Sequence, residues 1–146
     1  MTTGTKDSIL DLDEQLCFAL HAASRRVARA YTAALKPLGL TYPQYLALLV
    51  LWEWERDGCE RPTVSALGER LELDSGTLSP LIRRMILQGL VEKQRQVDDE
   101  RTVFIILTAA GRRLKRKVRA VPLAMLQQCS MPVAEVEQLR DQLKRL

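Results

Sequence analysis

Apolar residues recur along most of this chain at the three- and four-residue spacing of amphipathic helices. The first such pattern predicts a long helix from Asp11 to about residue 35, and Asp11 or Asp13 can cap its start. Pro37 and Gly39 end this helix. Its apolar positions are Leu12, Leu16, Ala19, Ala23, Val27, Ala30 and Ala34. The preceding residues 1–10 are small, polar and without periodicity, and we expect them to be disordered.

A second helix follows, with Thr41 as its N-cap and Pro43 in its first turn. Its apolar side is formed by Tyr45, Leu48, Leu49 and Trp52. The next stretch, 53–62 (EWERDGCERP), is highly charged and contains Gly and Pro. We therefore expect a surface connection that exposes Cys59.

Two shorter helices are predicted in the middle of the chain. The first runs from about Thr63, its N-cap, to Leu71, and the residues 73–76 form a turn. The second runs to about Gln88, and its start is open by several residues because Pro80 would bend its first turn.

The apolar period then changes from helical to two, which predicts a β-hairpin. Its strands cover residues 90–95 and 102–107, and the charged segment 97–101 joins them. Thr108 caps a basic helix, which extends past Pro122 with a kink or break there. Pro132 opens a last helix, whose apolar face consists of Val133, Val136, Leu139, Leu143 and Leu146.

This order of elements predicts a mainly α fold with a small β-hairpin wing, that is, a winged helix-turn-helix with N- and C-terminal dimerisation helices. We expect a single domain over 1–146, in which about 63–107 form the winged helix-turn-helix. The flanking segments, about 11–52 and 108–146, are longer than a small winged domain requires and carry apolar faces. Pairing them between two subunits would bury those faces, and the alternative is packing within one chain.

In a winged helix-turn-helix, the second helix of the pair enters the major groove of duplex DNA. Its outward residues are expected to be Ser75, Thr77, Ser79, Arg83 and Arg84. Lys93 and Arg95 on the hairpin would add phosphate contacts. The plainer alternative is that the hydroxyl residues cap the helix and the arginines keep it soluble. One such domain reads few base pairs, so the expected target is a pseudo-palindromic operator bound by a homodimer.

The hairpin tip carries the acidic residues Asp98, Asp99 and Glu100 before Arg101, which is unexpected for a DNA contact. The arrangement makes sense if an acidic residue such as Asp99 holds Arg101 in a bidentate pair. Arg101 can then enter the minor groove, where the potential is most negative.

Charge distribution agrees with a polyanionic partner. The chain has a net charge of +4, and residues 1–60 carry six Lys/Arg against eight Asp/Glu. The basic excess therefore lies in residues 61–146, although a solvated surface would explain it as well. No signal pattern begins the chain and no apolar run is long enough to span a bilayer, so we expect a cytoplasmic protein without a membrane partner.

Three cysteines, Cys17, Cys59 and Cys129, are widely spaced. An odd count argues against a disulfide framework. With no CxxC pair and His21 as the one histidine, we expect no metal and no cofactor. The thiols are then either buried or reactive.

The sequence resembles the MarR family of transcription regulators over nearly its whole length. The family pattern is visible in three segments: Thr63-Val-Ser-Ala-Leu-Gly-Glu-Arg-Leu71, Leu73-Asp-Ser-Gly-Thr-Leu-Ser-Pro-Leu81, and Asp99-Glu-Arg101 followed by Leu107-Thr-Ala-Ala-Gly111. Within the family it most resembles the organic-hydroperoxide-sensing repressors. Two segments carry that closer resemblance: Leu12-Asp-Glu-Gln-Leu-Cys-Phe-Ala-Leu20 and Gly39-Leu-Thr-Tyr-Pro-Gln-Tyr-Leu46.

The resemblance implies that Cys17 is the peroxide sensor and that Tyr31 and Tyr42 hydrogen-bond its thiolate. Cys17 and Tyr31 lie fourteen residues apart on one predicted helix, which is roughly 21 Å at about 1.5 Å per residue. Unless the helix breaks, Tyr31 can contact only the Cys17 of a partner subunit. The alternative reading of Cys17 is a small buried core residue.

Some of the resembled repressors use a second cysteine in a later helix, which implies a Cys17–Cys129 disulfide between subunits. A small external thiol is the alternative resolving group, and Cys59 has no assigned role. The expected protein is a repressor and not an enzyme: an organic hydroperoxide oxidises Cys17 and releases the dimer from its operator.

Three other functions are compatible with the same residues. A MarR-type regulator can sense a small aromatic ligand without covalent chemistry. A thiol peroxidase could use Cys17 with Cys129, although no Arg or Thr stands beside Cys17 and the winged domain would be unexplained. A constitutive architectural protein would bind DNA with little sequence preference and no redox response.

Overall fold

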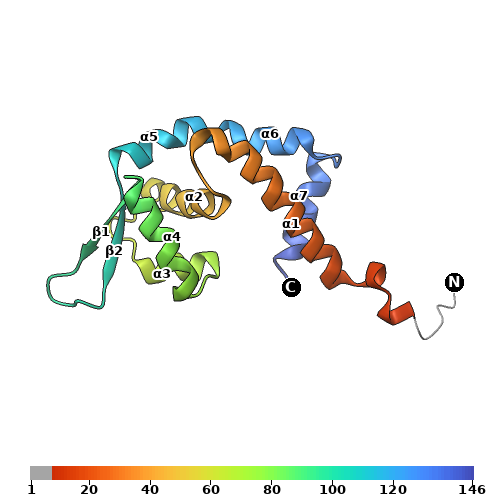
Figure 1. Cartoon of the computed structure of the whole chain (residues 1–146), viewed down its shortest axis with the longest axis horizontal. Helices are drawn as coiled ribbons and strands as arrows, with labels where there is room; N and C mark the ends of the chain where they lie inside the picture. The colour runs from red at the N-terminus through yellow and green to blue at the C-terminus, as the bar shows by residue number, and fades with distance from the viewer. Residues whose placement is uncertain (1–7) are drawn as a thin grey trace.

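The computed structural model describes residues 8–146. Of the stretch 1–10 expected to be disordered, residues 1–7 lie outside the described residues, and the expectation is wrong for residues 8–10, which form a 3-10 turn. The elements are η1 Ser8–Leu10, η2 Leu12–Glu14, α1 Leu16–Leu35, η3 Lys36–Leu38, α2 Tyr42–Arg56, α3 Val64–Leu71, α4 Ser75–Leu87, β1 Val91–Arg95, β2 Val103–Leu107, α5 Ala109–Val118, α6 Ala120–Gln128 and α7 Val133–Leu143. Figure 1 shows two lobes: α2, α3, α4 and the hairpin form one, and α1, α6 and α7 form the other. The predicted mainly helical fold with a hairpin wing is confirmed.

Helix α1 begins at Leu16, five residues later than predicted. Gln15 has an extended backbone and separates α1 from a single 3-10 turn that contains Asp13. Its side-chain amide donates to the carbonyl oxygens of Ile9 (2.6 Å) and Asp11 (3.1 Å). The predicted caps, Asp11 and Asp13, are therefore wrong. The Gln15 side chain holds the preceding turns, and the Asp11 side chain makes no cap hydrogen bond. The predicted end is confirmed: η3 contains Pro37, and Gly39 adopts a left-handed conformation with φ of 69°.

Helix α2 forms the centre of the winged lobe and contributes six of the nineteen buried apolar residues, more than any other element. The predicted N-cap is confirmed, because Thr41 Oγ1 accepts from the Gln44 N–H while Gln44 Oε1 accepts from the Thr41 N–H. The helix continues to Arg56, into the stretch that the sequence analysis assigned to a surface connection. The remainder of that stretch is exposed, and Cys59 with it, as predicted.

The helix-turn-helix pair differs from the prediction at its turn. Asp74 Oδ1 accepts from the Thr77 N–H at 2.7 Å and caps α4, so Ser75 and Gly76 are its first helical residues. Pro80 lies in the second turn without ending the helix. Because Pro80 has no N–H, the helix lacks one backbone hydrogen bond, the one to the Gly76 carbonyl. The position is exposed and near the helix start.

The wing is the predicted antiparallel hairpin, with Val91 opposite Leu107 and Arg95 opposite Val103. The segment before α3 extends it on one side: the Ile105 N–H donates to the Pro62 carbonyl at 2.9 Å, and Thr63 bridges Phe104. The wing is therefore joined to the helix-turn-helix along an edge as well as through its two ends.

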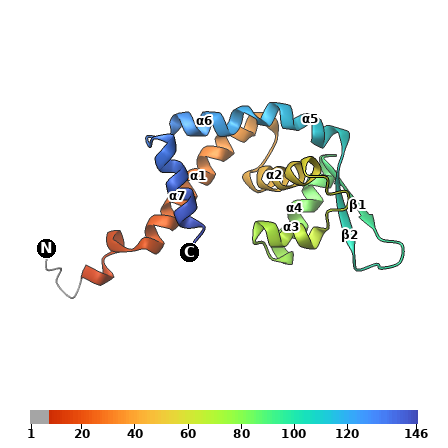
Figure 2. The same cartoon turned by 180° about the vertical axis from the view of Figure 1, so that it is seen from behind.

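Helices α5 and α6 connect the two lobes along one side of the molecule (Figure 2). Thr108 caps α5 as predicted, accepting from the Gly111 N–H at 3.1 Å. The predicted break near Pro122 lies at Arg119. This shift has a simple cause: Pro122 has no N–H to pair with the carbonyl of Val118, four residues earlier.

The lobe of α1, α6 and α7 leaves many apolar side chains in solvent. The exposed large apolar residues of this lobe and of the turns before it are Ile9, Leu10, Leu12, Leu16, Val27, Leu123, Leu126, Met131, Val133, Leu139, Leu143 and Leu146. Packing within one chain therefore does not bury them. Pairing between subunits stays a prediction. Among residues 8–146, no helix has the length and apolar content needed to cross a bilayer.

Gly111 lies where α5 packs against the end of α4 and against α2. A Cβ atom at this position would lie 2.2 Å from the Leu90 carbonyl oxygen, and the Trp52 indole N–H donates to the Gly111 carbonyl at 3.1 Å. Gly111→Ala should therefore lower the free energy of unfolding by more than about 2 kcal/mol, because backbone must shift.

Chemical denaturation followed by circular dichroism measures this loss. The control is Ala109→Gly, at the exposed first position of the same helix, which should cost less than about 1 kcal/mol. Equal losses in the two variants would show that the close approach at Gly111 is unimportant.

Candidate DNA-binding face and redox site

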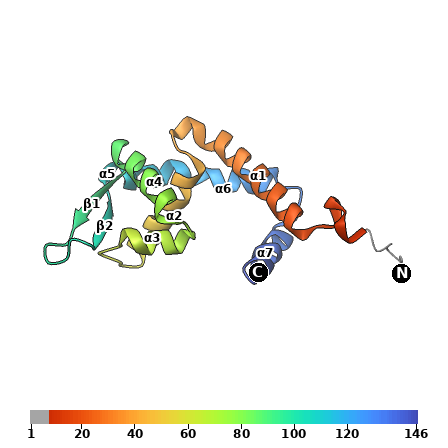
Figure 3. The ribbon, with the colours of Figure 1, turned by 60° about the horizontal axis from the view of Figure 1, so that its bottom comes forward.

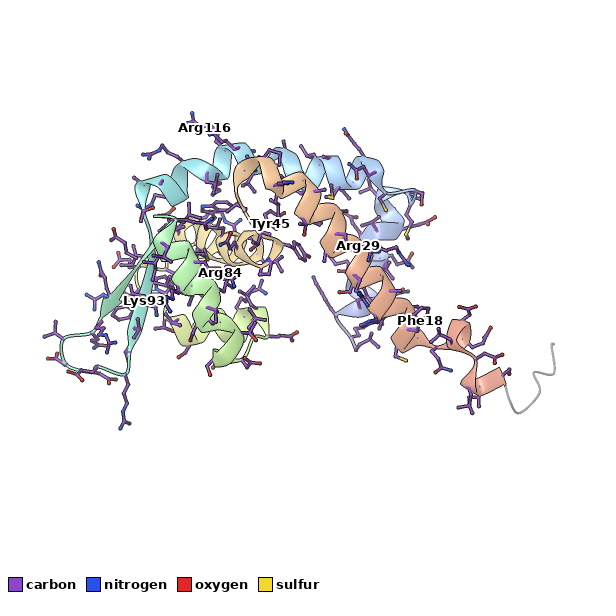
Figure 4. The ribbon with its side chains drawn as sticks, viewed as in Figure 1. Phe18, Arg29, Tyr45, Arg84, Lys93 and Arg116 are labelled. Atoms are coloured by element: carbon purple, nitrogen blue, oxygen red, sulfur yellow. The ribbon has the colours of Figure 1, made fainter. Side chains whose placement is uncertain are left out.

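The residues predicted to read DNA all lie on exposed positions of the winged lobe. Ser75, Thr77, Ser79, Arg83 and Arg84 are exposed along α4, and Lys93 and Arg95 are exposed on β1. Figure 4 shows Arg84 and Lys93 on these neighbouring elements, while Arg116 on α5 points away from both. The hydrogen bond from the backbone of Thr77 lowers the pKa of the Asp74 carboxyl, so this cap stays charged near the helix start.

The predicted bidentate pair at the wing tip is wrong. Asp99 Oδ1 accepts from the backbone N–H of Arg101 at 3.0 Å, and Oδ2 accepts from the Thr102 hydroxyl at 3.0 Å. The Asp99 carboxylate thus closes the loop by accepting from the backbone N–H two residues further along the chain, as Asp side chains commonly do in turns. Within residues 8–146, the ion pairs do not include Arg101, whose side chain is exposed at the tip.

Arg61 is a basic residue of the wing that the sequence analysis missed. Its guanidinium carbon lies 5.6 Å from the centroid of the Phe104 ring, on the segment that extends the hairpin edge. Its position two residues before the predicted N-cap Thr63 was the available signal, because a cap fixes the path of the chain that leads into the helix.

The three cysteines are exposed free thiols, and the chain does not bring them together with the predicted tyrosines. Cys17 lies in the first turn of α1, Cys129 follows α6 as its C-cap, and Cys59 lies in the connection after α2. Because α1 runs unbroken from Leu16 to Leu35, Cys17 and Tyr31 are separated by roughly 21 Å along its axis.

The structure does bring Tyr31 and Tyr42 together, and it adds a third tyrosine. The ring centroids of Tyr31 and Tyr42 are 4.9 Å apart, and Tyr45 lies 5.3 Å from Tyr31. From the sequence, Tyr45 was expected only on the apolar side of this helix. Its spacing of three from Tyr42 on one helix was the signal that both rings share a face.

Tyr31, Tyr42 and Tyr45 form a tyrosine cluster, in which the phenols of Tyr42 and Tyr45 have a raised pKa. Burial, followed by the proximity of Tyr31, raises the pKa of Tyr45 to about 12. The same two causes raise the pKa of Tyr42. Phenols that hold their protons can stabilise an anion placed among them, and a thiolate is such an anion.

Tyr45 also lines a groove of about 410 Å³ between α2 and the α5–α6 segment. We call it the α2–α6 groove. Its apolar lining includes Leu49, Trp52 and Leu123, and the basic residues that line it are Arg56, Lys115 and Arg119.

A pair of glutamines connects the tyrosine cluster to the DNA-reading helix. Gln44 lies on α2 between Tyr42 and Tyr45 and is buried, and its side-chain amide donates to Gln88 Oε1 at 2.9 Å. Gln88 is the C-cap of α4 and donates to the Gly39 carbonyl at 3.0 Å. The start of α2 and the end of α4 are therefore joined by a direct side-chain hydrogen bond.

Known proteins resemble this chain in sequence and in fold. The family model "Transcriptional regulator SarA/Rot" matches residues 29–118. The organic hydroperoxide resistance transcriptional regulator of Bacillus subtilis is 44% identical over 137 residues, which cover 94% of this chain and 90% of the relative. The chain belongs to the MarR/SarA family of winged-helix transcription regulators. Its resemblance to the organic-hydroperoxide branch is confirmed by this relative.

Solved structures agree with this assignment. Reduced AbfR bound to DNA has a TM-score of 0.78 at 33% identity, with 97% of this chain and 95% of that chain covered. AbfR is a protein of Staphylococcus epidermidis. A MarR-family regulator from Rhodococcus sp. RHA1 has a TM-score of 0.80 at 26% identity, with 92% and 94% covered. A disulfide-formed state of AbfR matches with a TM-score of 0.65 at 34% identity, with 96% and 95% covered.

The raised pKa of Tyr45 predicts a pH dependence of stability. A phenol whose pKa is about 12 when folded and about 10 when unfolded favours the folded state below pH 10. Stability should therefore fall as the pH rises from 10 to 12. Urea unfolding of the wild type and of Tyr45→Phe at a series of pH values measures this. The fall should be smaller in the variant, and identical pH profiles would contradict the assignment.

Proposed function

We propose that this protein is a thiol-based redox sensor that represses transcription as a DNA-binding homodimer. One observation carries the proposal. The reactive candidate Cys17 and the tyrosines able to stabilise its thiolate stand at opposite ends of one unbroken helix, so a second subunit is needed to unite them. The sensor then lies at the dimer interface, and its oxidation changes how the two subunits sit together.

DNA binding rests on the winged lobe. α4 enters the major groove with its exposed hydroxyl and arginine side chains, and Lys93, Arg95 and Arg101 of the wing contact phosphates and the minor groove. Arg61 joins this set from the edge of the hairpin. Two such lobes in one dimer match the two half-sites of a pseudo-palindromic operator. The DNA-bound structure of the related AbfR supports this use of the fold.

Sensing begins when the Cys17 thiolate attacks the terminal oxygen of an organic hydroperoxide. An S–O bond forms, the O–O bond breaks and an alcohol leaves after taking up a proton, so Cys17 becomes a sulfenic acid. The thiol of Cys129 then attacks this sulfur and water leaves, which gives a disulfide between subunits. A small external thiol can take the place of Cys129. Disulfide formation in AbfR supports the first route.

The change at the interface reaches DNA through the two glutamines. Oxidation removes the thiolate from the partner's tyrosine cluster, and the start of α2 moves with its tyrosines. Because Gln44 bonds Gln88 at the end of α4, the DNA-reading helix moves as well. The two helices α4 of the dimer then no longer match the spacing of the half-sites, and the gene is expressed. The protein acts in the cytoplasm, where the operator is, and catalyses no turnover of peroxide.

Cys17→Ser should bind the operator with the wild-type affinity and stay bound after treatment with cumene hydroperoxide, because the oxidisable sulfur is gone. The wild type should release the operator after the same treatment and bind it again after reduction with dithiothreitol. Electrophoretic mobility shifts at fixed salt measure both. Arg84→Ala is the matched control and should lose affinity before and after treatment. Peroxide-driven release of the Cys17→Ser protein would sink the proposal.

Gln88→Ala should weaken the coupling between oxidation and release. The reduced variant should bind the operator within about threefold of the wild type, since Gln88 faces α2 and not the reading face. Its oxidised form should keep at least about tenfold more affinity than oxidised wild type, which corresponds to the loss of a coupling of about 1.4 kcal/mol.

Leu87→Ala is the control for this prediction, because Leu87 is the exposed neighbour at the same helix end. It should switch like the wild type. If the oxidised Gln88→Ala protein releases the operator as completely as the oxidised wild type does, the proposed route is contradicted.

A further inference from the structure

The eight residues before α1 form an ordered arm that leaves its apolar side chains in solvent. This N-terminal arm, Ser8–Gln15, consists of two 3-10 turns that the Gln15 side chain holds by its hydrogen bonds to Ile9 and Asp11. Ile9, Leu10 and Leu12 are 75%, 84% and 59% exposed. Figures 1 and 3 show the arm projecting from the far end of α1, away from both lobes.

The charges of the arm are all of one sign. Asp11, Asp13 and Glu14 lie within it, and residues 8–16 contain no Lys or Arg. A partner surface for this arm should therefore be apolar with a basic rim.

The α2–α6 groove has that chemistry. Leu49, Trp52 and Leu123 give it an apolar lining, and Leu49 and Leu123 are large apolar residues exposed on the single chain. Two charged residues of its lining already have partners: Arg56 pairs with Asp57, and the acidic Glu53 pairs with Arg70. Within the described part of the chain, the ion pairs include neither Lys115 nor Arg119, which leaves these two cations to meet an acidic segment.

Position links the arm to the groove. The arm ends two residues before Cys17, and Tyr45 belongs both to the tyrosine cluster and to the lining of the groove. If Cys17 meets the tyrosine cluster of the partner subunit, the arm of that chain comes to the groove beside it. Leu12 precedes Cys17 by five residues, so it lies within about 18 Å of it.

We propose that the N-terminal arm of each subunit docks in the α2–α6 groove of its partner. Leu12 of the arm and Leu16 at the start of α1 cover Leu123 and Leu49, and the acidic side chains of the arm face Lys115 and Arg119. This inference rests on the proposed sensor, because that sensor sets the side of the partner on which Cys17 lies. The docked arm makes the groove a protein interface and leaves it closed to a free small ligand.

Disulfide crosslinking tests the contact directly. In a background of Cys17→Ser, Cys59→Ser and Cys129→Ser, the pair Leu12→Cys with Leu123→Cys should give covalent dimers on mild oxidation. Each single cysteine alone should give few. The control pair is Leu12→Cys with Leu87→Cys, because Leu87 is even more exposed than Leu123 but lies on the other lobe. No more dimer from the first pair than from the control would overturn the proposal.

Charge reversal tests the basic rim. In the crosslinking background, Lys115→Glu with Arg119→Glu should slow dimer formation by about fivefold, and adding Asp11→Lys with Asp13→Lys should restore it. Arg116→Glu with Lys117→Glu is the matched control, and Arg116 points away from the body of the molecule (Figure 4). An equal effect of both reversals would show a general charge effect and count against the contact.

The two proposals fail separately. If the crosslink does not form while Cys17→Ser still abolishes release by peroxide, the sensor stands and the docked arm is wrong. If the crosslink forms while release ignores Cys17, the arm contact stands as an interface and the redox function is wrong.

Discussion

Helix α1 keeps Cys17 and the tyrosine cluster apart, and the proposed sensor depends on this separation. Its backbone hydrogen bonds run unbroken from Leu16 to Leu35, so Cys17 and Tyr31 cannot approach each other in one chain. The exposed leucines of α1, α6 and α7 point to the same conclusion, because a single subunit leaves them in water. In the proposed dimer a second subunit buries these leucines and brings tyrosines to Cys17, so the proposed sensor reports on the arrangement of the dimer.

The tyrosine cluster stands where the two lobes meet. Tyr31 belongs to the end of α1, and Tyr42 and Tyr45 belong to the first turns of α2, which is also the centre of the winged lobe. Gln44 lies between the two α2 tyrosines and bonds the last turn of α4. Short connections therefore join the tyrosine cluster to the reading helix, and in the proposed mechanism small movements at the interface change the spacing of the two DNA-reading helices.

Much of the fold follows from local patterns that the sequence makes visible. Thr41, Thr63 and Thr108 cap helices as predicted, because the N-cap preference depends on neighbours three residues away. The errors arose where one polar side chain could form either of two local hydrogen bonds. Asp74 extends α4 into the predicted turn, Gln15 delays α1, and Asp99 bonds its own loop backbone instead of the Arg101 side chain. Tyr45 was not predicted as a site residue, because in the sequence a tyrosine on the apolar side of a helix looks like any core residue. The structure shows its ring beside that of Tyr31.

The most direct test of the shared sensor is a mixed dimer. One subunit carries Cys17→Ser with intact tyrosines, and the other carries Tyr31→Phe and Tyr42→Phe with its Cys17 intact. Only one sensor thiol remains, and its own chain lacks the two tyrosines. The rate at which cumene hydroperoxide oxidises that thiol is the measurement, with the Tyr31→Phe/Tyr42→Phe homodimer as reference. A site shared between subunits predicts the wild-type rate in the mixed dimer, because the tyrosines of the other chain complete it. A rate as slow as that of the reference homodimer would contradict the account.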